Sequence, residues 1–266
     1  MKQVIDMAEY NGLLLEKRGH TALVTLNNPP AHTWTLDSLA DLTRLVVDLN
    51  ADREIYSLVL TGSGEKFFSA GADLKLFATG DKAVARAMAR RFGEAFEALA
   101  GFRGLSIAAI NGYAMGGGLE CALACDLRVA EDHAQMALPE ATVGLLPCAG
   151  GSQWLSWQVG EAWAKRLILC GERVDAATAL RIGLVQEVVQ RGQALERALT
   201  LASLVERQSP TSVAACKKLI HGARTQSPTA TLVAEREAFV DLFDTHDQRE
   251  GVNAFLGKRP PQWQNA

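Results

Sequence analysis

Three consecutive glycines stand directly before a glutamate in the stretch INGYAMGGGLECALACDLRVA, residues 110–130. Glycine lets the backbone approach another group closely, and these glycines separate a strand-like run from a helix-like run. Backbone N–H groups at the start of a helix stabilise an oxygen that becomes negative during a reaction, with help from the helix dipole. We therefore predict an oxyanion hole here, with Gly117 as a donor.

A second N–H group of this kind is expected in the stretch FFSAGADLKLF, where Ala72 follows Gly71 just before a predicted helix. Two such loops side by side could bind one carbonyl oxygen. The loss of one donor in such a site costs about 2.7–4 kcal/mol of transition-state stabilisation, so a pair of donors is a large contribution. The expected geometry of these two loops does not decide their role, so the alternative that both are only tight turns stays open.

Phosphate binding is the other usual role of a glycine run between a strand and a helix. The chain contains no GxxxxGK[ST] motif, and GYAMGGG does not have the GxGxxG spacing. A carboxylate at Glu120 would also repel a phosphate. The glycines therefore favour an oxyanion hole over a phosphate site.

Two glutamates lie in apolar surroundings close to these glycine-rich turns. Glu120 follows the glycine run, and Glu140 follows a proline in MALPEATVGLLP. Each has a structural alternative, since Glu120 could complement a helix N-terminus and Glu140 could cap a helix or lie in a solvated loop. Together they could hold a water molecule and move protons between oxygen and carbon, because burial raises the pKa of at least one of them.

Nucleophilic and metal-dependent mechanisms have no comparable pattern. None of the five histidines lies near a GxSxG motif or a similar feature. The cysteines are odd in number and show no CxxC or Cys/His clustering, which predicts neither a disulfide framework nor a metal site. We expect reduced and mostly buried thiols at Cys121, Cys125, Cys148, Cys170 and Cys216.

Three similar units along the chain position these residues. Each begins with a strand-like run, YSLVLTG, LSIAAING or CDLRVAE, and continues through a turn into a second short apolar piece and a helix. Repetition at about 20–50 residues predicts an α/β spiral of repeated strand-strand-helix turns rather than a doubly wound sheet. From about Ala176 the pattern is mainly helical, so we expect a spiral core over residues 1–195 and a C-terminal helical region over residues 196–266.

The composition argues against two classes of partner. The 266 residues are 48% hydrophobic and have a net charge of −3, which gives no general attraction to nucleic acid. No run approaches the roughly 20 apolar residues that a membrane helix needs. We therefore expect a cytoplasmic protein that binds neither nucleic acid nor a membrane.

Several blocks in the correct order resemble the crotonase superfamily and, within it, the enoyl-CoA hydratases. They are VTLNNPPAHTWTLDSL, FFSAGADLK, AAINGYAMGGGLECALACDLRVA, MALPEATVGLLPCAGGSQWL, GERVDAATALRIGLVQEVV and REGVNAFLGKRPPQW. The resemblance implies a crotonase-like spiral in which the N–H groups of Ala72 and Gly117 bind the acyl thioester oxygen. Hydratases of this family have two catalytic glutamates, at the positions of Glu120 and Glu140, whereas related isomerases generally keep only the second.

The resemblance also implies the reaction. Water adds reversibly to a 2-enoyl-CoA thioester to give a 3-hydroxyacyl-CoA, and Glu120 helps to activate the water while Glu140 holds it and protonates the α-carbon. The N–H pair holds the enolate more tightly than the ground-state carbonyl. No metal and no separate cofactor is expected, because coenzyme A arrives as part of the substrate.

Further substrate contacts follow from the same resemblance. Ala70, Asp73 and Leu74 are expected to bind the substrate, and Phe255 and Lys258 match positions that approach coenzyme A, often from a neighbouring subunit. A solvated lysine is the alternative for Lys258. The helical C-terminal region is thereby expected to complete the site and to form a homotrimer or a homohexamer, a dimer of trimers.

The predicted helix KAVARAMARRFGEAFEALAGF places five apolar residues near one face, which most simply predicts core packing. They are Val84, Met88, Phe92, Phe96 and Leu99. Because this region borders the acyl tail in the family, Met88 or Phe92 could limit the length of the acyl chain.

Three residues depart from the family pattern. Trp34 lies in a stretch where the family often has asparagine, then alanine or serine, then leucine, Cys148 stands where glycine is common, and Trp154 stands where arginine is frequent. They could alter the coenzyme A site, the acyl pocket or subunit packing. The alternatives to simple hydration are an enoyl-CoA isomerase, a hydratase for branched or carboxylated acyl groups, and a binding protein on this scaffold, for instance one that recognises RNA.

Overall fold

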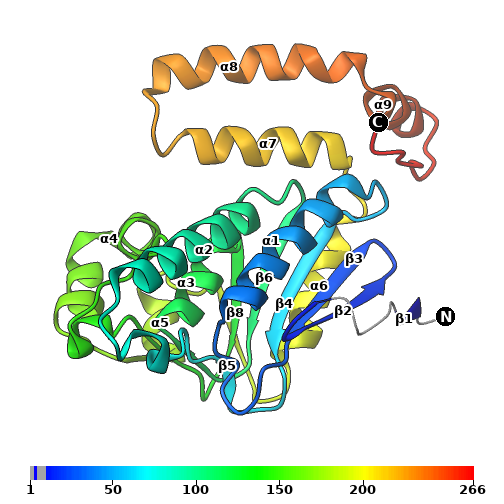
Figure 1. Cartoon of the computed structure of the whole chain (residues 1–266). Coiled ribbons are helices and arrows are strands. Elements are labelled where there is room, and N and C mark those ends of the chain that lie inside the picture. The colour runs from blue at the N-terminus through cyan, green and yellow to red at the C-terminus, as the bar shows by residue number, and fades with distance from the viewer. Residues whose placement is uncertain (1–2, 5–9) are drawn as a thin grey trace.

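Each turn of the chain between residues 57 and 169 contributes one strand to a large sheet and one strand to a small sheet before it enters a helix. This order confirms the expected α/β spiral. The structure is a computed structural model that describes residues 3–4 and 10–266 (Figure 1). The turns are β4 (Ser57–Gly62), β5 (Phe67–Ser69), η1 (Leu74–Phe77) and α2 (Lys82–Ala100); β6 (Leu105–Ile110), β7 (Tyr113–Met115) and α3 (Gly117–Ala124); and β8 (Leu127–Glu131), β9 (Gln135–Ala137), η2 (Glu140–Val143) and α4 (Gly151–Leu169).

The large sheet has seven strands within the described residues, in the order β1-β2-β3-β4-β6-β8-β11. β2 and β3 form an antiparallel hairpin, and the strands from β3 to β11 run parallel. Every residue of β4 is buried, because packed elements cover both faces of the sheet at this strand. The other strands are β1 (Gln3–Val4), β2 (Leu13–Arg18), β3 (Thr21–Leu26) and β11 (Glu187–Val189).

The small sheet has the order β10-β9-β7-β5, where β10 is Val174–Asp175. β5 pairs with β7 in parallel, and Ser69 lies opposite Ala114. Because the two strands run in the same direction, the loops that follow them leave the sheet next to each other. This pairing places the loop that contains Ala72 beside the glycine run.

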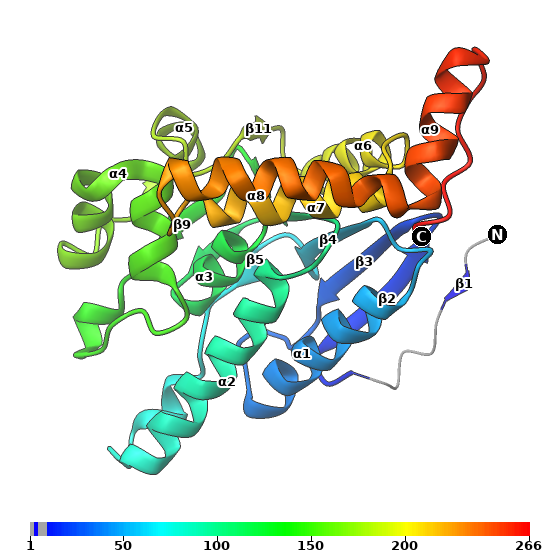
Figure 2. The same cartoon turned by 90° about the horizontal axis from the view of Figure 1, so that it is seen from above.

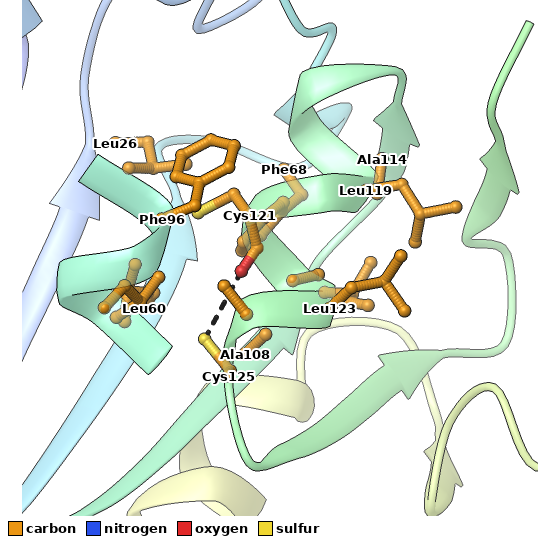
Figure 3. Packing of buried hydrophobic residues seen from close by; sticks show 14 of the residues in the cluster. Leu26, Leu60, Phe68, Phe96, Ala108, Ala114, Leu119, Cys121, Leu123 and Cys125 are labelled. Carbon is orange, nitrogen blue, oxygen red and sulfur yellow. Dashed lines mark hydrogen bonds between the residues drawn. The ribbon is translucent and has the colours of Figure 1, made fainter. Parts of the chain in front are cut away.

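The main hydrophobic core lies between the sheets and helices α1, α2 and α3. Helix α1 (Leu36–Ala51) begins with a capping box in which Thr35 and Ser38 exchange hydrogen bonds between side chain and backbone. Phe96 of α2 packs near Cys121 of α3, and both are fully buried (Figure 3). This packing fixes the start of α3, where the glycine run ends.

The cysteines are unpaired, but the expectation that they are mostly buried is wrong for three of them. Cys121 and Cys125 are buried in α3 and at its end, and the Cys125 thiol donates to the Cys121 carbonyl at 3.6 Å (Figure 3). Cys148, Cys170 and Cys216 are exposed. Apolar flanks in the sequence do not distinguish a core position from the wall of a cavity or the surface of a helix.

The expected boundary between residues 195 and 196 falls inside helix α6 (Ala194–Val205). Small residues of this helix, Ala194, Ala198 and Ala202, are fully buried against the large sheet, where Val59 and Ile107 belong to the same cluster. We therefore propose that the spiral core extends to the end of α6 and that the separate helical region begins after it. Helix α5 (Ala176–Arg181) precedes β11.

The remaining helices form a layer of their own beside the core (Figures 1 and 2). Asp126 attaches this layer to the core, since the Lys217 ammonium donates to its carboxylate at 2.7 Å and to the Gly104 carbonyl at 3.0 Å. Along the described residues, no helix is both long and apolar enough to cross a membrane. The helices are α7 (Pro210–Gly222), α8 (Pro228–Asp241), η3 (Leu242–Asp244) and α9 (His246–Leu256).

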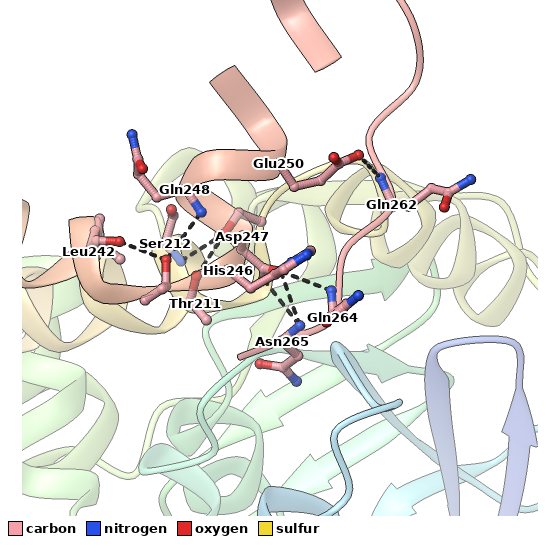
Figure 4. Close-up of polar contacts among 12 residues, drawn as sticks. Thr211, Ser212, Leu242, His246, Asp247, Gln248, Glu250, Gln262, Gln264 and Asn265 are labelled. Carbon is pink, nitrogen blue, oxygen red and sulfur yellow. Dashed lines mark hydrogen bonds and ion pairs between the residues drawn. The ribbon is translucent and has the colours of Figure 1, made fainter. Parts of the chain in front are cut away.

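The last residues of the chain fold back onto the start of α9 (Figure 4). The fully buried Asp247 carboxylate accepts from the N–H of Gln264 at 2.8 Å and of Asn265 at 3.2 Å. The Asn265 side chain donates in turn to the carbonyl of Arg53, at 2.7 Å, in the loop before β4. These bonds fix α9 relative to the core.

Candidate active site

A cavity of about 720 Å³ lies where the loops after β5 and β7, helix α2 and residues 139–148 meet. Ala70, Ala72, Asp73 and Leu74 line it from the first loop, and Gly117 lines it from the second. Both glutamates that the sequence singles out also lie on its wall. The fold thus brings the two predicted N–H donors and the two predicted carboxylates to one cavity.

The two N–H donors come from loops in direct contact. Gly71 has a positive φ of 85°, and a Cβ atom placed on it would lie 2.9 Å from the backbone N of Gly117. The Gly71 carbonyl accepts from the N–H of Trp34 at 2.8 Å, which holds the first loop in place. Within the described residues, neither the Ala72 N–H nor the Gly117 N–H donates to a protein group, so both can bind an added oxygen.

Gly116 explains why the glycine run needs more than one glycine. Its φ of 52° lies in a region that residues with a side chain rarely adopt, and a Cβ atom would lie 3.0 Å from Oε1 of Glu140. Its N–H donates to the Ala137 carbonyl at 3.0 Å. Gly116 therefore turns the chain into α3 and leaves room for the carboxylate beside it.

Glu120 lies in the first turn of α3 and is only 2% exposed. Its Oε1 atom accepts from the N–H of Ala149 at 2.8 Å and from the N–H of Gly151, the first residue of α4, at 2.9 Å. Burial raises the pKa of Glu120, and these two hydrogen bonds lower it and so oppose part of that effect. The carboxylate is thus fixed in orientation and favoured in its ionised form by two N–H groups.

Glu140 begins the short helix η2 and has a different environment. Its Oε2 atom is buried and has no hydrogen-bond partner within the described residues. Burial, together with a smaller effect of the Glu120 charge, raises the pKa of Glu140 to about 7, and a hydrogen bond from its own backbone opposes part of this shift. Glu140 can therefore gain or lose a proton near neutral pH, which is what a general acid or base requires.

Cys148 lines the cavity, although the sequence analysis singled it out only because glycine is common at this position in the family. It lines the cavity directly before Ala149, whose N–H holds Glu120. Although Cys148 is exposed to the open cavity, the surrounding protein partly desolvates its thiol, and this desolvation together with the charges of both glutamates raises the pKa of Cys148 to about 11. The thiol therefore stays neutral at physiological pH and is a weak nucleophile.

Helix α2 forms the wall opposite residues 139–148. Phe92 is buried and lines the cavity, whereas Met88 is 1% exposed within the hydrophobic core and does not line it. The suggestion that Met88 limits the acyl chain is therefore wrong. Ala85 and Ala89 line the cavity instead, and no pattern in the sequence distinguished these two alanines from their neighbours.

Trp34 and Trp154, the two tryptophans that depart from the family pattern, pack against other residues of the protein in this structure. Trp34 is 2% exposed and its ring meets that of Phe96 edge-on, with centroids 5.5 Å apart. The ring of Trp154 covers Gly150, at a distance of 2.7 Å from the position that a Cβ atom would take. Neither residue lines the cavity.

Phe255 and Lys258 lie at the end of α9 and beyond it, outside this cavity. Phe255 is 84% exposed, and Lys258 has a positive φ of 51°. Their part in substrate binding stays a prediction that needs a second copy of the chain. Within the described residues, no group of three or more His, Cys, Asp or Glu side chains is arranged to hold a metal ion.

The arrangement can polarise a carbonyl and move a proton. Two N–H groups without protein acceptors can bind one oxygen, and the dipole of α3 adds to the field at that point. One carboxylate is fixed by N–H groups, and the other has a pKa near neutrality. Such a site fits chemistry at the carbon atoms next to an activated carbonyl group.

Comparisons with known proteins agree with this chemistry. The family model described as enoyl-CoA hydratase/isomerase matches residues 16–266. A "short-chain-enoyl-CoA hydratase" of Clostridium acetobutylicum is 36% identical over 94% of this chain and 97% of its own. A "2,3-dehydroadipyl-CoA hydratase" of Escherichia coli is 39% identical over 94% of this chain and 98% of its own.

Solved structures extend the comparison to three dimensions. The structure of Pseudomonas aeruginosa DspI is 66% identical and covers 98% of this chain and 99% of its own, with a TM-score of 0.94. An enoyl-CoA hydratase of Bacillus anthracis is 32% identical and covers 96% of this chain and 100% of its own, with a TM-score of 0.92. The resemblance therefore includes the C-terminal helices as well as the spiral core.

Proposed function

The chain belongs to the enoyl-CoA hydratase/isomerase family, and on that basis we propose that this enzyme adds water reversibly to a 2-enoyl-CoA thioester. The observation that supports hydration is the presence of both Glu120 and Glu140 on the wall that also presents the N–H groups of Ala72 and Gly117. The product is a 3-hydroxyacyl-CoA, and the reaction belongs to fatty-acid metabolism.

In the proposed mechanism, the thioester oxygen accepts from the N–H groups of Ala72 and Gly117. Glu120 takes a proton from the water as its oxygen attacks the β-carbon, and electrons move to the thioester oxygen to form an enolate. Glu140 donates a proton to the α-carbon as the enolate collapses, and the proton that Glu120 took from the water then passes to Glu140, which restores the starting state of both carboxyl groups. The N–H pair holds the enolate more tightly than the carbonyl, which lowers the barrier.

The proposed reaction needs no cofactor, because coenzyme A is part of the substrate and the two glutamates account for every proton that is transferred. We further propose that Ala70, Asp73 and Leu74 contact the substrate, since they line the cavity. The odd number of cysteines and the three exposed thiols favour the cytoplasm over an oxidising compartment.

A homotrimer or a homohexamer is the proposed assembly. Helices α8, η3 and α9 present a series of exposed apolar side chains, which is typical of a surface that another subunit covers. Phe255 and Lys258 would then reach the coenzyme A of a neighbouring subunit. The exposed apolar residues are Leu232, Val233, Phe239, Val240, Phe243, Val252, Phe255 and Leu256.

The loss of the conjugated enoyl-thioester absorbance tests the proposal. Purified protein is mixed with crotonyl-CoA, and the product is identified by mass. Loss of absorbance with formation of 3-hydroxybutyryl-CoA supports hydration. Binding of acyl-CoA without loss of absorbance for any enoyl-CoA would contradict it.

Double-bond migration is a second candidate, because the family includes isomerases and Glu140 alone could move a proton between two carbons at its pKa of about 7. It differs from hydration in its dependence on Glu120. An isomerase would convert a 3-enoyl-CoA without adding mass, and the conversion would survive Glu120→Gln.

An RNA-binding role on this scaffold would be supported only by binding that weakens steeply with salt, because phosphate contacts release counterions. The net charge of −3 does not favour it.

A further inference from the structure

Much of the cavity wall beside the N–H donors and the two glutamates is apolar. Helix α2 contributes Ala85, Ala89 and Phe92 from one face, at positions i, i+4 and i+7. The segment after Glu140 contributes Val143 and Leu146 to the same cavity. A thioester bound at the donors would direct its acyl chain along these apolar side chains.

The side chains that α2 presents to the cavity at Ala85 and Ala89 are small and leave room for a ligand. Ala85 is exposed and Ala89 is half-buried, so both methyl groups face the open cavity rather than the core. The bulky residue of the neighbouring face, Met88, is turned into the core. At about 720 Å³ the cavity lies within the range of about 300–1,000 Å³ that encloses drug-sized ligands, which is far more than a four-carbon acyl group fills.

The ionisable side chains that line the cavity within the described residues are all acidic. Among the described residues that line the cavity, the ionisable carboxyl groups are Asp73, Glu120 and Glu140, and no lysine, arginine or histidine is present. A carboxylate at the far end of an acyl chain would meet apolar side chains and no cation among these lining residues. Exposed Leu146, at 71%, and Val143, at 52%, instead offer apolar surface.

We propose that this site selects uncharged acyl chains of more than four carbons, that Ala85 and Ala89 leave the room for the chain, and that the acidic and apolar wall rejects chains with a terminal carboxylate. This inference rests on the proposed hydration of enoyl-CoA and names its substrate class. It differs from the reaction in the name of the 2,3-dehydroadipyl-CoA hydratase of Escherichia coli, whose printed substrate has a second carboxylate.

The first experiment compares three thioesters with the wild-type protein: crotonyl-CoA, trans-2-octenoyl-CoA and 2,3-dehydroadipyl-CoA. We expect kcat/KM to be at least tenfold higher for the octenoyl thioester than for the crotonyl thioester. We expect the dehydroadipyl thioester to be at least tenfold poorer than the octenoyl thioester. Equal or lower kcat/KM for octenoyl-CoA than for crotonyl-CoA, or equal use of the dicarboxylic thioester, would overturn the proposal.

The second experiment fills the space on α2. Ala89→Phe and Ala85→Phe are expected to lower kcat/KM for octenoyl-CoA at least tenfold while they change the value for crotonyl-CoA less than threefold. Ala87→Phe is the matched control, because Ala87 is exposed on the same helix and does not line the cavity. An equal loss for both substrates, or no loss for either, would contradict the role of these alanines.

A binding measurement separates this proposal from the proposed function. The saturated thioesters octanoyl-CoA and butyryl-CoA bind without reaction, and calorimetry gives their dissociation constants. We expect octanoyl-CoA to bind at least tenfold more tightly, and Ala89→Phe to remove that difference. If no enoyl-CoA is hydrated but this preference is present, hydration is wrong and the acyl-chain inference stands; equal binding of the two would overturn the inference.

Discussion

Glu120 and Glu140 face the same cavity, but Glu120 is held by two N–H groups from a distant segment of the chain, whereas Glu140 has a backbone hydrogen bond only within its own residue. Oε1 of Glu120 accepts two backbone hydrogen bonds, whereas the buried Oε2 of Glu140 has no partner within the described residues. Hydrogen bonds to a carboxylate favour its ionised form, and burial without them favours the protonated form. This difference supports the proposed roles, in which Glu120 acts as the base and Glu140 as the acid.

The substitution Glu120→Gln is expected to lower kcat for hydration by about 10²- to 10⁴-fold, the usual contribution of a general base. The glutamine oxygen can still accept from the N–H groups of Ala149 and Gly151. The melting temperature should therefore change little. Glu97→Gln, at an exposed position of α2, is the control and should keep full activity; wild-type activity in Glu120→Gln would exclude Glu120 as the base.

The substitution Glu140→Gln is expected to stabilise the protein at high pH. Because the pKa of Glu140 is raised to about 7, the folded state binds this proton more tightly than the unfolded state. The resulting stability is fully present below about pH 4.5 and is lost as pH rises through 7. At about 1.36 kcal/mol per pKa unit, reduced because solvent screens this half-buried group, the variant should exceed the wild type by about 1–2 kcal/mol above pH 8.

Urea unfolding at pH 4.5 and pH 8.5 checks this prediction. The difference in unfolding free energy between Glu140→Gln and the wild type should be small at the lower pH and large at the higher one. A difference of the same size at both pH values would mean that ionisation of Glu140 does not cause it.

The pH dependence of catalysis should follow the titration of Glu140, because the proposed active form has Glu140 protonated and Glu120 ionised. As pH rises through about 7, Glu140 loses this proton and kcat/KM for hydration should fall, approaching tenfold per pH unit. In the reverse direction, kcat/KM for dehydration of the 3-hydroxyacyl-CoA should fall over the same pH range, because the overall reaction neither releases nor takes up a net proton. Profiles from pH 5.5 to 9 in both directions measure this; a flat profile above pH 6.5 would be inconsistent with Glu140 as the acid.

Alkylation should detect Cys148 as a cavity residue. Its pKa of about 11 keeps the thiol protonated, so iodoacetamide at pH 8 should modify it slowly, and bound acyl-CoA should slow the reaction further. Glu120→Gln and Glu140→Gln each remove a negative charge and should speed the modification. The measurement is made by peptide mass, with the exposed Cys170 as an internal reference whose rate none of these changes should alter.

The substitution Lys258→Ala is expected to raise KM for crotonyl-CoA severalfold with little change in kcat, if the lysine contacts the coenzyme A of a neighbouring subunit. The matched substrate is the crotonyl thioester of pantetheine, which lacks the nucleotide and its phosphates. Its KM should be the same for the variant and the wild type. Equal effects on both thioesters would place the lysine away from the nucleotide, and no effect on either would leave it as a solvated surface residue.

The sequence by itself determined the spiral and the candidates for chemistry. The strand-turn-strand-helix order repeats within short windows, and backbone propensity together with apolar periodicity acts over the same range. The glycine run and the two glutamates are also local patterns. For this reason Ala72, Gly117, Glu120 and Glu140 could be proposed together before any coordinates were known.

Only the tertiary structure decided which residues share a wall. One position along a helix rotates a side chain by about 100°, so Met88 is in the core while Ala89 faces the cavity. The raised pKa of Glu140 and the place of Cys148 depend on the approach of α3, η2 and α4, which are separate in the sequence. Burial and charge proximity arise from contacts between distant segments, and no local pattern encodes them.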